Sequence, residues 1–467
     1  MVEGFARSVL VLAAGAALAA ALPAAAQHPA EGRNMALVGY HDLQGRSAYQ
    51  PLVHKQGGHW IAYIGHHGGL LPNALTGRKE SSGTSILDVT DPKRPRYLAH
   101  IPGEPGGGAQ MVRVCGGAGL PRADKAKVYL LRPFGNSAQE LWDVTDPARP
   151  SRITTIVGNI HGTHKNWWEC DSGIAYLVSG VAGWRTHRMT QVYDLGDPAK
   201  PVFIRNFGLP GQQPGAAGPV PTELHGMIST GPKGNRIYFG YGTNRSGVLQ
   251  IIDRERLIKG PKEPTDENLL YPQVSRLDMP PDAGAHTVFP MLGVEIAEFA
   301  RDRAGRVRDF VVIVNESLAN ECQEARQMAW FVDITTETRP FGAATWTVPE
   351  ASGGFCSRGG RFGTHSSNES FAPVYYKRIV FFAHFNAGVR AVDVRDPYNP
   401  REVGFYIPAT TDRTERRCAG GERCKFAIQT NNVEVDDRGY IYIVDRADTG
   451  MHILELTGPA RAIARLP

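Results

Sequence analysis

The sequence lacks a block of basic residues, a C-x-x-C pair, and any long apolar run beyond the one near its start. Its 51 Lys and Arg residues against 46 Asp and Glu residues leave a net charge of +5 over 467 residues. That mild excess gives no case for nucleic-acid binding. The missing C-x-x-C argues against a redox-active dithiol and against covalently attached haem.

Familiar catalytic motifs are missing too. There is no G-x-S-x-G, no P-loop and no D-x-D-x-D-G loop, and His161-Gly-Thr-His164 does not match the helical H-E-x-x-H. No Gly/Ser-rich or Pro-rich spacer divides the chain, since its 53 glycines and 33 prolines are spread as turn residues. We therefore expect a single domain over residues 27–467.

Residues 1–26 resemble a secretory signal. Arg7 precedes the apolar run 9–22, and Ala24-Ala25-Ala26 matches a small-residue cleavage site. The alternative is an anchor that is retained. No other window approaches eighteen apolar residues, so no membrane span is expected once the signal is removed. The sequence thus predicts a periplasmic or secreted protein.

Six cysteines in an exported chain predict disulfides. Cys418 and Cys424 flank a five-residue loop that can close on itself. Cys115 and Cys170 occupy comparable places in consecutive repeats, and Cys322 and Cys356 remain as the third pair. The alternative is free buried thiols.

What the chain does contain is a repeat. Seven times an aliphatic strand ends in an acidic residue, and the clearest copies continue into Asp-Pro. The clear copies centre on Asp88, Asp143, Asp194 and Asp393, and the degenerate ones on Asp253, Asp333 and Glu455. A period of roughly 40–50 residues with several strands per unit is typical of a β-propeller.

The copy at 364–408 is the cleanest. Strands are expected at 364–371, 378–384, 389–394 and 401–407, and Asp393 and Pro397 suit a tight turn between the last two. The sequence therefore predicts an all-β, seven-bladed β-propeller with four-stranded antiparallel blades. The last repeat, 431–456, has only three obvious strands. We expect residues 35–41 to supply the fourth, pair with residues 450–456 and so close the ring.

The aliphatic-aliphatic-Asp-Val-x-Asp-Pro endings at Asp88, Asp143 and Asp393 resemble the LVIVD-repeat family of surface and exported proteins. The resemblance implies a propeller and says little about activity. The fourth and fifth repeats depart from the pattern, because they lack the Asp-Pro and carry insertions at 260–278 and 297–309.

Histidines recur at one place in the repeat. Counting back from each acidic turn to the first strand of its blade gives His54, Gln110, His164, His225, His286, His365 and Asn431. First strands line the centre of a propeller, so these positions should converge on the axis. Several imidazoles meeting at one point suit a borderline transition metal. We expect copper or zinc held by a subset of His54, His164, His225, His286 and His365; the alternative is structural histidines.

Second strands end on the same face. Their ends carry His66-His67, Arg132, His187, Asn315-Glu316, His384 and Arg446. We expect His66, His67, His384 and Arg446 to form a rim around the site. Glu223 lies two residues before His225 and Glu369 four after His365, spacings that keep side chains on one face of a strand. Both are candidate metal ligands, partners of an imidazole, or general bases.

These residues predict a metal-dependent enzyme acting on a small molecule, by oxidase or by hydrolase or lyase chemistry. With copper, the architecture would be similar to the selenium-binding/methanethiol oxidase propellers, a likeness of fold and ligand type only. The alternative is a non-catalytic platform for an envelope partner protein or glycan. That function would need an exposed aromatic cluster, for which Trp184 and Tyr375-Tyr376 are scattered candidates. Trp167-Trp168 is interpreted as packing between blades.

Overall fold

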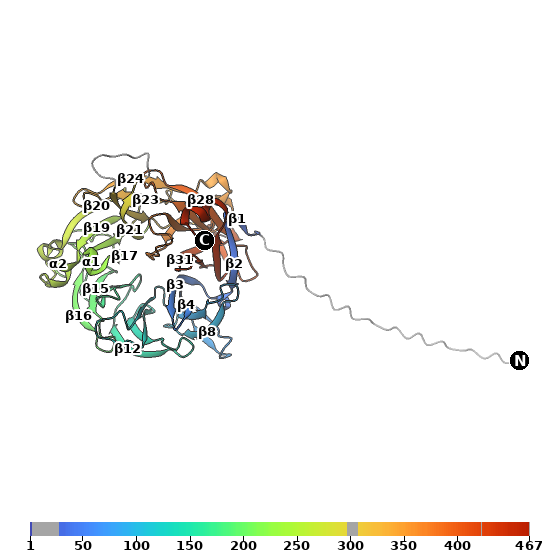
Figure 1. Ribbon diagram of the computed structural model, residues 1–467, viewed down its shortest axis with the longest axis horizontal. Helices are drawn as coiled ribbons and strands as arrows, with labels where there is room; N and C mark the ends of the chain where they lie inside the picture. The colour runs from blue at the N-terminus through green and yellow to red at the C-terminus, as the bar shows by residue number, and fades with distance from the viewer. Residues whose placement is uncertain (2–27, 297–306, 422, 467) are drawn as a thin grey trace.

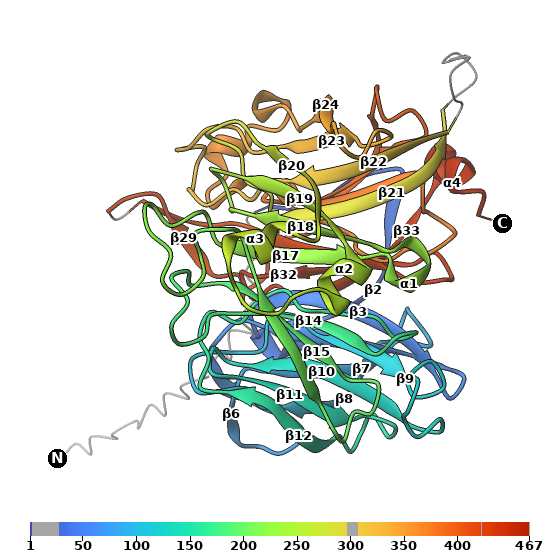
Figure 2. The same cartoon turned by 90° about the vertical axis from the view of Figure 1, so that its left-hand side faces the viewer.

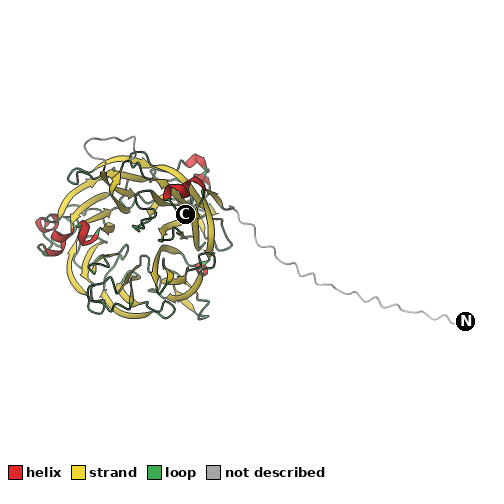
Figure 3. Ribbon diagram, in the orientation of Figure 1, coloured by secondary structure: helices red, strands yellow, loops and turns green. Residues whose placement is uncertain are grey.

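The computed structural model describes residue 1 and residues 28–296, 307–421 and 423–466. This part of the chain is all-β, and its antiparallel sheets are arranged radially around a common centre (Figures 1 and 3). Residues 2–26 of the expected signal and residues 297–306 of the insertion at 297–309 lie outside the described residues. No described helix is long and apolar enough to cross a membrane.

Five sheets of the described chain have four strands each, paired in chain order. The first joins β3 (Ala48–Gln56), β4 (His59–His66), β7 (Thr84–Asp88) and β8 (Arg96–Ile101); the second β9 (Arg113–Gly116), β10 (Val128–Phe134), β11 (Ala138–Asp143) and β12 (Ser151–Gly158); the third β13 (Trp167–Trp168), β14 (Ile174–Ser179), β15 (Met189–Asp194) and β16 (Val202–Phe207); the fourth β17 (Leu224–Ser229), β18 (Arg236–Tyr241), β19 (Val248–Asp253) and β20 (Gln273–Asp278); the fifth β21 (Thr287–Glu295), β22 (Val307–Val314), β23 (Ala329–Asp333) and β24 (Phe341–Trp346). The strand that begins each sheet faces the centre (Figure 2 gives the side view).

A larger sheet holds the two ends of the chain. It contains two groups of strands, linked by the single pairing of Phe385 with Thr430. One group is β25 (Phe362–Ser367), β26 (Ile379–Phe385), β27 (Val389–Asp393), β28 (Arg401–Ile407) and β1 (Glu31–Arg33); the other is β31 (Thr430–Val435), β32 (Ile441–Asp445), β33 (Met451–Leu456) and β2 (Met35–His41).

The N-terminal strand β2 pairs with β33, as the repeat count predicted. The antiparallel register runs from Met35 opposite Leu456 to His41 opposite Met451, and Figure 1 shows the blue strand at this place beside the last strands of the chain. Strand β1 pairs in addition with β28. The N-terminal segment therefore supplies an edge strand to both groups and leaves neither of these edges unpaired.

The acidic residues form turns. A carboxylate oxygen accepts a hydrogen bond from the backbone N–H two residues further on at Asp88, Asp143, Asp194 and Asp393, at 2.8–3.1 Å. These are Asx turns, in which the side chain fixes the reversal between third and fourth strands. Asp253 differs: its carboxylate accepts from Arg256 N at 3.0 Å and caps α2 (Arg254–Lys259). The expected insertion at 260–278 consists of α3 (Asp266–Leu270) and β20.

The core lies between neighbouring sheets. In one cluster Phe289 of β21, Phe310 of β22 and Phe382 of β26 are all at most 1% exposed. Three disulfides add covalent links at the expected pairs, Cys115–Cys170, Cys322–Cys356 and Cys418–Cys424. Disulfides fit a protein of an oxidising compartment.

Candidate metal centre

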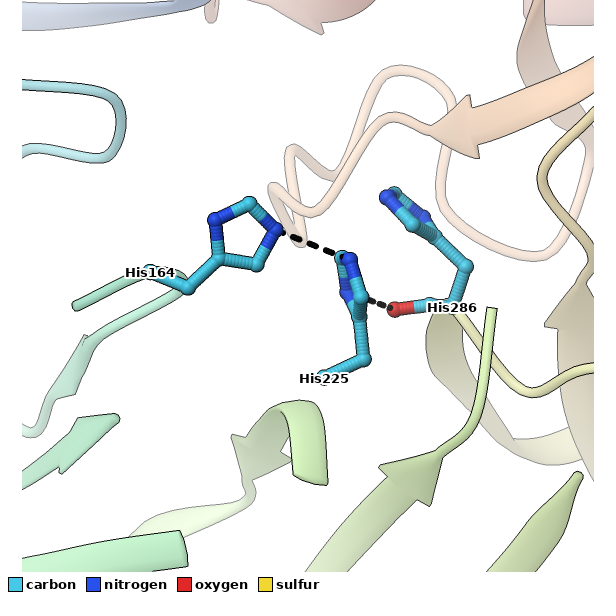
Figure 4. Close-up of side chains that lie close together, drawn as sticks. All are labelled: His164, His225 and His286. Atoms are coloured by element: carbon cyan, nitrogen blue, oxygen red, sulfur yellow. Dashed lines mark hydrogen bonds between the residues drawn. The ribbon is translucent and has the colours of Figure 1, made fainter. Parts of the chain in front are cut away.

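Four of the predicted histidines meet at the centre. His225 lies in β17 and His365 in β25, while His286 directly precedes β21 and His164 lies three residues before β13. All four are at most 6% exposed. Neighbouring ring centroids are 4.3 Å apart for His164 and His225, 3.8 Å for His225 and His286, and 4.4 Å for His286 and His365. The inner strands of four sheets thus place four imidazoles side by side (Figure 4 shows three of them).

The Nδ1 atoms of these rings have hydrogen-bond partners outside the cluster. His225 Nδ1 donates to the His286 carbonyl at 3.0 Å, and His365 Nδ1 donates to the Asn431 carbonyl. His164 Nδ1 donates to Gln110 Oε1, and His286 Nδ1 contacts Thr287 Oγ1 at 3.0 Å. A carbonyl oxygen can only accept, so the contacts of His164, His225 and His365 place the proton on Nδ1 and leave the Nε2 lone pair available. The Thr287 hydroxyl can donate or accept, so its contact does not set the tautomer of His286.

The Nε2 atoms face one another. His164 Nε2 and His225 Nε2 are 2.8 Å apart, and the Nε2 of His286 has no hydrogen-bond partner among the described residues. A neutral imidazole carries one proton, and on His164 and His225 that proton is already on Nδ1. With both protons on Nδ1, two lone pairs face each other at hydrogen-bond distance, and Tyr49 Oη is a further hydrogen-bond partner of His164 Nε2 at 3.2 Å. A cation between the two nitrogens would satisfy both lone pairs.

Burial keeps the rings neutral. Desolvation is the main cause that holds the pKa of His164, His225, His286 and His365 well below the ordinary range. Positive neighbours add to this effect, Arg188 on His164 and His225 and Arg446 on His365. An additional proton on these rings is therefore disfavoured.

One carboxylate completes the cluster. Glu316, two residues after β22, is 7% exposed. Its Oε2 lies 3.6 Å from His286 Nε2 and 3.9 Å from His225 Nε2, and its Oε1 lies 3.6 Å from His365 Nε2. Two groups of atoms within 4.8 Å of one another form potential ligand sets: His164, His225 and His286, and His286, Glu316 and His365. Burial raises the pKa of Glu316, opposed by Arg361, Arg446 and Arg188.

The first sheet contributes Tyr49 to this centre. Tyr49 Oη lies 3.2 Å from His164 Nε2, and the ring is in edge contact with His365. The predicted residue of this sheet, His54, lies five positions further along β3, opposite Ile61 and away from the cluster. The structure therefore corrects the prediction for His54. The hairpin of β5 (Leu70–Pro72) and β6 (Lys79–Ser81) lengthens this repeat, so counting back from Asp88 reaches His54 and not Tyr49, five residues earlier in β3.

The two carboxylates singled out from the sequence lie apart from the four imidazoles. Glu223 is partly exposed, with Oε1 3.7 Å from Arg188 Nη1. Glu369 is buried in ion pairs with Arg113, at 2.5 Å, and with Lys165. Neither belongs to the ligand sets. Glu316 takes this place, and the only sequence signal for it was its position at a second-strand end.

The expected rim residues divide into two pairs. Arg446 Nη1 lies 3.8 Å from Glu316 Oε1, and the His67 ring contacts Tyr49, so both border the centre. His66 instead bonds Ser85 Oγ at 2.7 Å. His384 is packed against Trp346 and Phe362, and burial lowers its pKa to about 3. The prediction that His66 and His384 belong to the rim is therefore wrong, because both side chains are buried in contacts within the protein.

The structure does not bring the three aromatic candidates from the sequence, Trp184, Tyr375 and Tyr376, into one exposed cluster. Tyr375 is 1% exposed and Trp184 packs against a core cluster. Tyr376 is partly buried beside Trp167 and Phe371, with which it lines a cavity of about 420 Å³. Aromatic side chains thus gather at this cavity, where Tyr376 is the only one of the three candidates.

No known protein-family model matches the chain, and no curated protein matches its sequence. The solved structures that it resembles include Sqt1 from Chaetomium thermophilum, with a TM-score of 0.45 and 10% sequence identity over 88% of this chain and 84% of that one. A likeness this distant says nothing about the function of the chain.

Proposed function

We propose that this protein is an exported, seven-bladed β-propeller that holds a transition metal at its axis and acts as a metal-dependent enzyme on a small molecule. In this proposal the strand groups β25–β28 and β31–β33 are the last two blades, and β2 closes the ring. The LVIVD-like turns, the signal-like residues 1–26 and the three disulfides support export to the periplasm or beyond.

The main observation that supports a bound metal is the pair of facing imidazole nitrogens. His164 Nε2 and His225 Nε2 lie 2.8 Å apart while both Nδ1 atoms donate elsewhere. In proteins that bind metals through histidine, the second ring nitrogen donates to a carbonyl or carboxylate in this manner, which orients the ring and raises its basicity. The pattern is therefore the one that a ligand set requires.

The ligands would be His164, His225 and His286, with Glu316 and His365 at the other side of His286. Imidazoles with a single carboxylate suit zinc and copper, whereas calcium and magnesium prefer oxygen ligands. A bound ion of this kind polarises a substrate oxygen or lowers the pKa of a water.

Two of this chain's own residues are placed to move a proton. Burial raises the pKa of Glu316, so this carboxylate can accept a proton more readily than an exposed one. Tyr49, whose Oη lies 3.2 Å from His164 Nε2, is a hydroxyl donor beside the cluster. We assign the acid–base role to Glu316, in place of Glu223 and Glu369.

The test is metal analysis of untagged protein purified from a periplasm. Inductively coupled plasma mass spectrometry should find about one zinc or copper per chain, and the doubly substituted His225→Ala, His286→Ala protein should lose it. The matched control is His54→Ala, which removes a histidine of an inner strand outside the ligand sets. Wild-type protein without stoichiometric metal, or equal loss in the control, would contradict the proposal.

A further inference from the structure

Three arginines from different parts of the chain converge on the candidate metal centre. Arg188 directly precedes β15, Arg361 directly precedes β25 and Arg446 directly follows β32. Their side chains are partly exposed, at 19%, 23% and 18%. The four imidazoles are buried, so these guanidinium groups are the part of the centre that meets solvent.

Distances place two of them on Glu316. Arg361 Nη1 donates to Glu316 Oε1 at 3.0 Å and to the Ser317 carbonyl at 3.3 Å. Arg446 Nη1 lies 3.8 Å from the same oxygen, beyond hydrogen-bond distance, and its guanidinium makes no hydrogen bond within the described chain. One arginine is therefore the fixed partner of Glu316, and the other remains free to bind something else.

Arg188 lies on the other side of the centre. Its Nε donates to the Gly162 carbonyl at 3.1 Å, and its Nη1 is 3.7 Å from the partly exposed Glu223. Its charge acts on His164 and His225, whereas the charge of Arg446 acts on His365 and His67. Both charges also act on Glu316 and on Tyr49, so the two guanidiniums border the same centre.

The positive charges exceed the negative ones at this place. Three guanidiniums face two carboxylates, Glu316 and Glu223, and the latter is partly exposed. The imidazoles contribute no negative charge, and a divalent ion held by them would add two positive charges. Partly buried positive charge that its own chain does not balance is the usual means of binding an anion.

We propose that the centre binds a small molecule through an anionic oxygen group, a carboxylate or phosphate, held between Arg446 and Arg188 beside the imidazoles. This inference rests on the proposed function, because it names the substrate class of that same site. The planar guanidinium matches carboxylate and phosphate oxygens with paired N–H donors. A neutral sugar or hydrocarbon would leave the excess charge unbalanced.

The experiment measures anion binding and metal content on the same samples. Isothermal titration calorimetry in chloride buffer of low ionic strength would use inorganic phosphate and benzoate as probes, on untagged protein as purified. We expect one site per chain for at least one probe. Arg446→Gln should weaken it at least tenfold, as should Arg188→Gln, which serves if the first variant fails to fold. Arg446→Lys, which keeps the charge, should lose less than Arg446→Gln.

The matched control is Arg395→Gln, which removes an exposed arginine whose partner is Asp393 in an Asx turn. This variant should bind the probes as the wild type does. Metal-loaded protein that binds neither probe, or equal affinities in wild type and both Gln variants, would overturn the anion site and leave the metal proposal standing. Arginine-dependent anion binding in protein without stoichiometric metal would sustain the anion site and reject the metal enzyme.

Discussion

Two groups of polar side chains lie along the inner strands, the histidine centre and a network around Glu369. They differ in whether their polar groups have partners within the protein. At the histidine centre, His164 Nε2 and His225 Nε2 lie 2.8 Å apart, and His286 Nε2 has no hydrogen-bond partner among the described residues. Further along the strands, Glu369 pairs with Arg113 and Lys165, and its backbone N–H donates to Glu434 Oε1 at 2.8 Å.

The difference separates a structural network from a site. In the glutamate network every charge has a partner within the protein, so removal of one member exposes another to an apolar surrounding. In the histidine centre, His286 Nε2 has no partner within the described chain. Replacing this imidazole should therefore cost little folding free energy, and under the proposed function it should greatly weaken metal binding. Folding and binding can thus be tested separately on residues of the same inner strands.

The largest expected effect is on the glutamate network. Glu369→Gln would leave Arg113 and Lys165, 8% and 3% exposed, without their carboxylate, and should lower the free energy of unfolding by about 3–5 kcal/mol. Urea unfolding measures this. Glu255→Gln breaks the exposed pair with Lys259 and should cost no more than about 0.5 kcal/mol. Similar costs for the two variants would show that the buried network is not structural.

Added metal should raise the stability of the wild type and leave that of the His286→Gln variant unchanged. At a free ion concentration one hundred times the Kd, binding adds about 2.7 kcal/mol to the stability of the folded state. His286→Gln, measured without metal, should unfold within about 1 kcal/mol of the wild type, because its Nε2 has no partner to lose. Differential scanning calorimetry with and without zinc should show a rise in Tm for the wild type alone; an equal rise in both would place the ion elsewhere.

The pH dependence of stability should report on Glu434. Burial, with the nearby Glu369, raises the pKa of Glu434 to about 8 in the folded protein from the ordinary value of 4.5. Between these values the folded state holds a proton that the unfolded state releases, so stability falls as pH rises. Glu434→Gln does not titrate and should gain about 3.5 kcal/mol relative to the wild type between pH 5 and pH 8. An equal stability difference between Glu434→Gln and the wild type at pH 5 and at pH 8 would contradict the raised pKa of Glu434.

The smallest effect is expected at Tyr49. Tyr49→Phe removes the hydroxyl 3.2 Å from His164 Nε2 and keeps the ring contacts with His67 and His365. The metal-free protein should lose about 1 kcal/mol or less, the net value of one hydrogen bond. Stoichiometric metal should remain, because Tyr49 is outside the ligand sets. Loss of metal on this substitution would make Tyr49 a ligand.

The sequence predicted the sheets well because their turns have a local code. An Asp that bonds the N–H two residues later needs only its own neighbours, so Asp88, Asp143, Asp194 and Asp393 mark their turns. Four of the five predicted histidines meet, because each lies at or just before the first strand of its sheet.

The errors arise where non-local features intervene. The β5–β6 hairpin shifts the count in the first sheet, so Tyr49 takes the place expected of His54. Glu369 lies four residues after His365, but the bonds that decide its role come from Arg113 and Lys165 on other strands. Glu316 reaches the imidazoles from just beyond the end of a second strand, and only the packing of neighbouring sheets brings it there.

The most direct test of the metal centre is X-ray absorption at the metal edge of untagged protein from a periplasm. The account predicts nitrogen and oxygen scatterers at about 2.0–2.2 Å, with the outer-shell pattern of at least two imidazoles that disappears in the His225→Ala, His286→Ala protein. Protein without a bound ion, or an ion whose spectrum has no imidazole contribution, would contradict it.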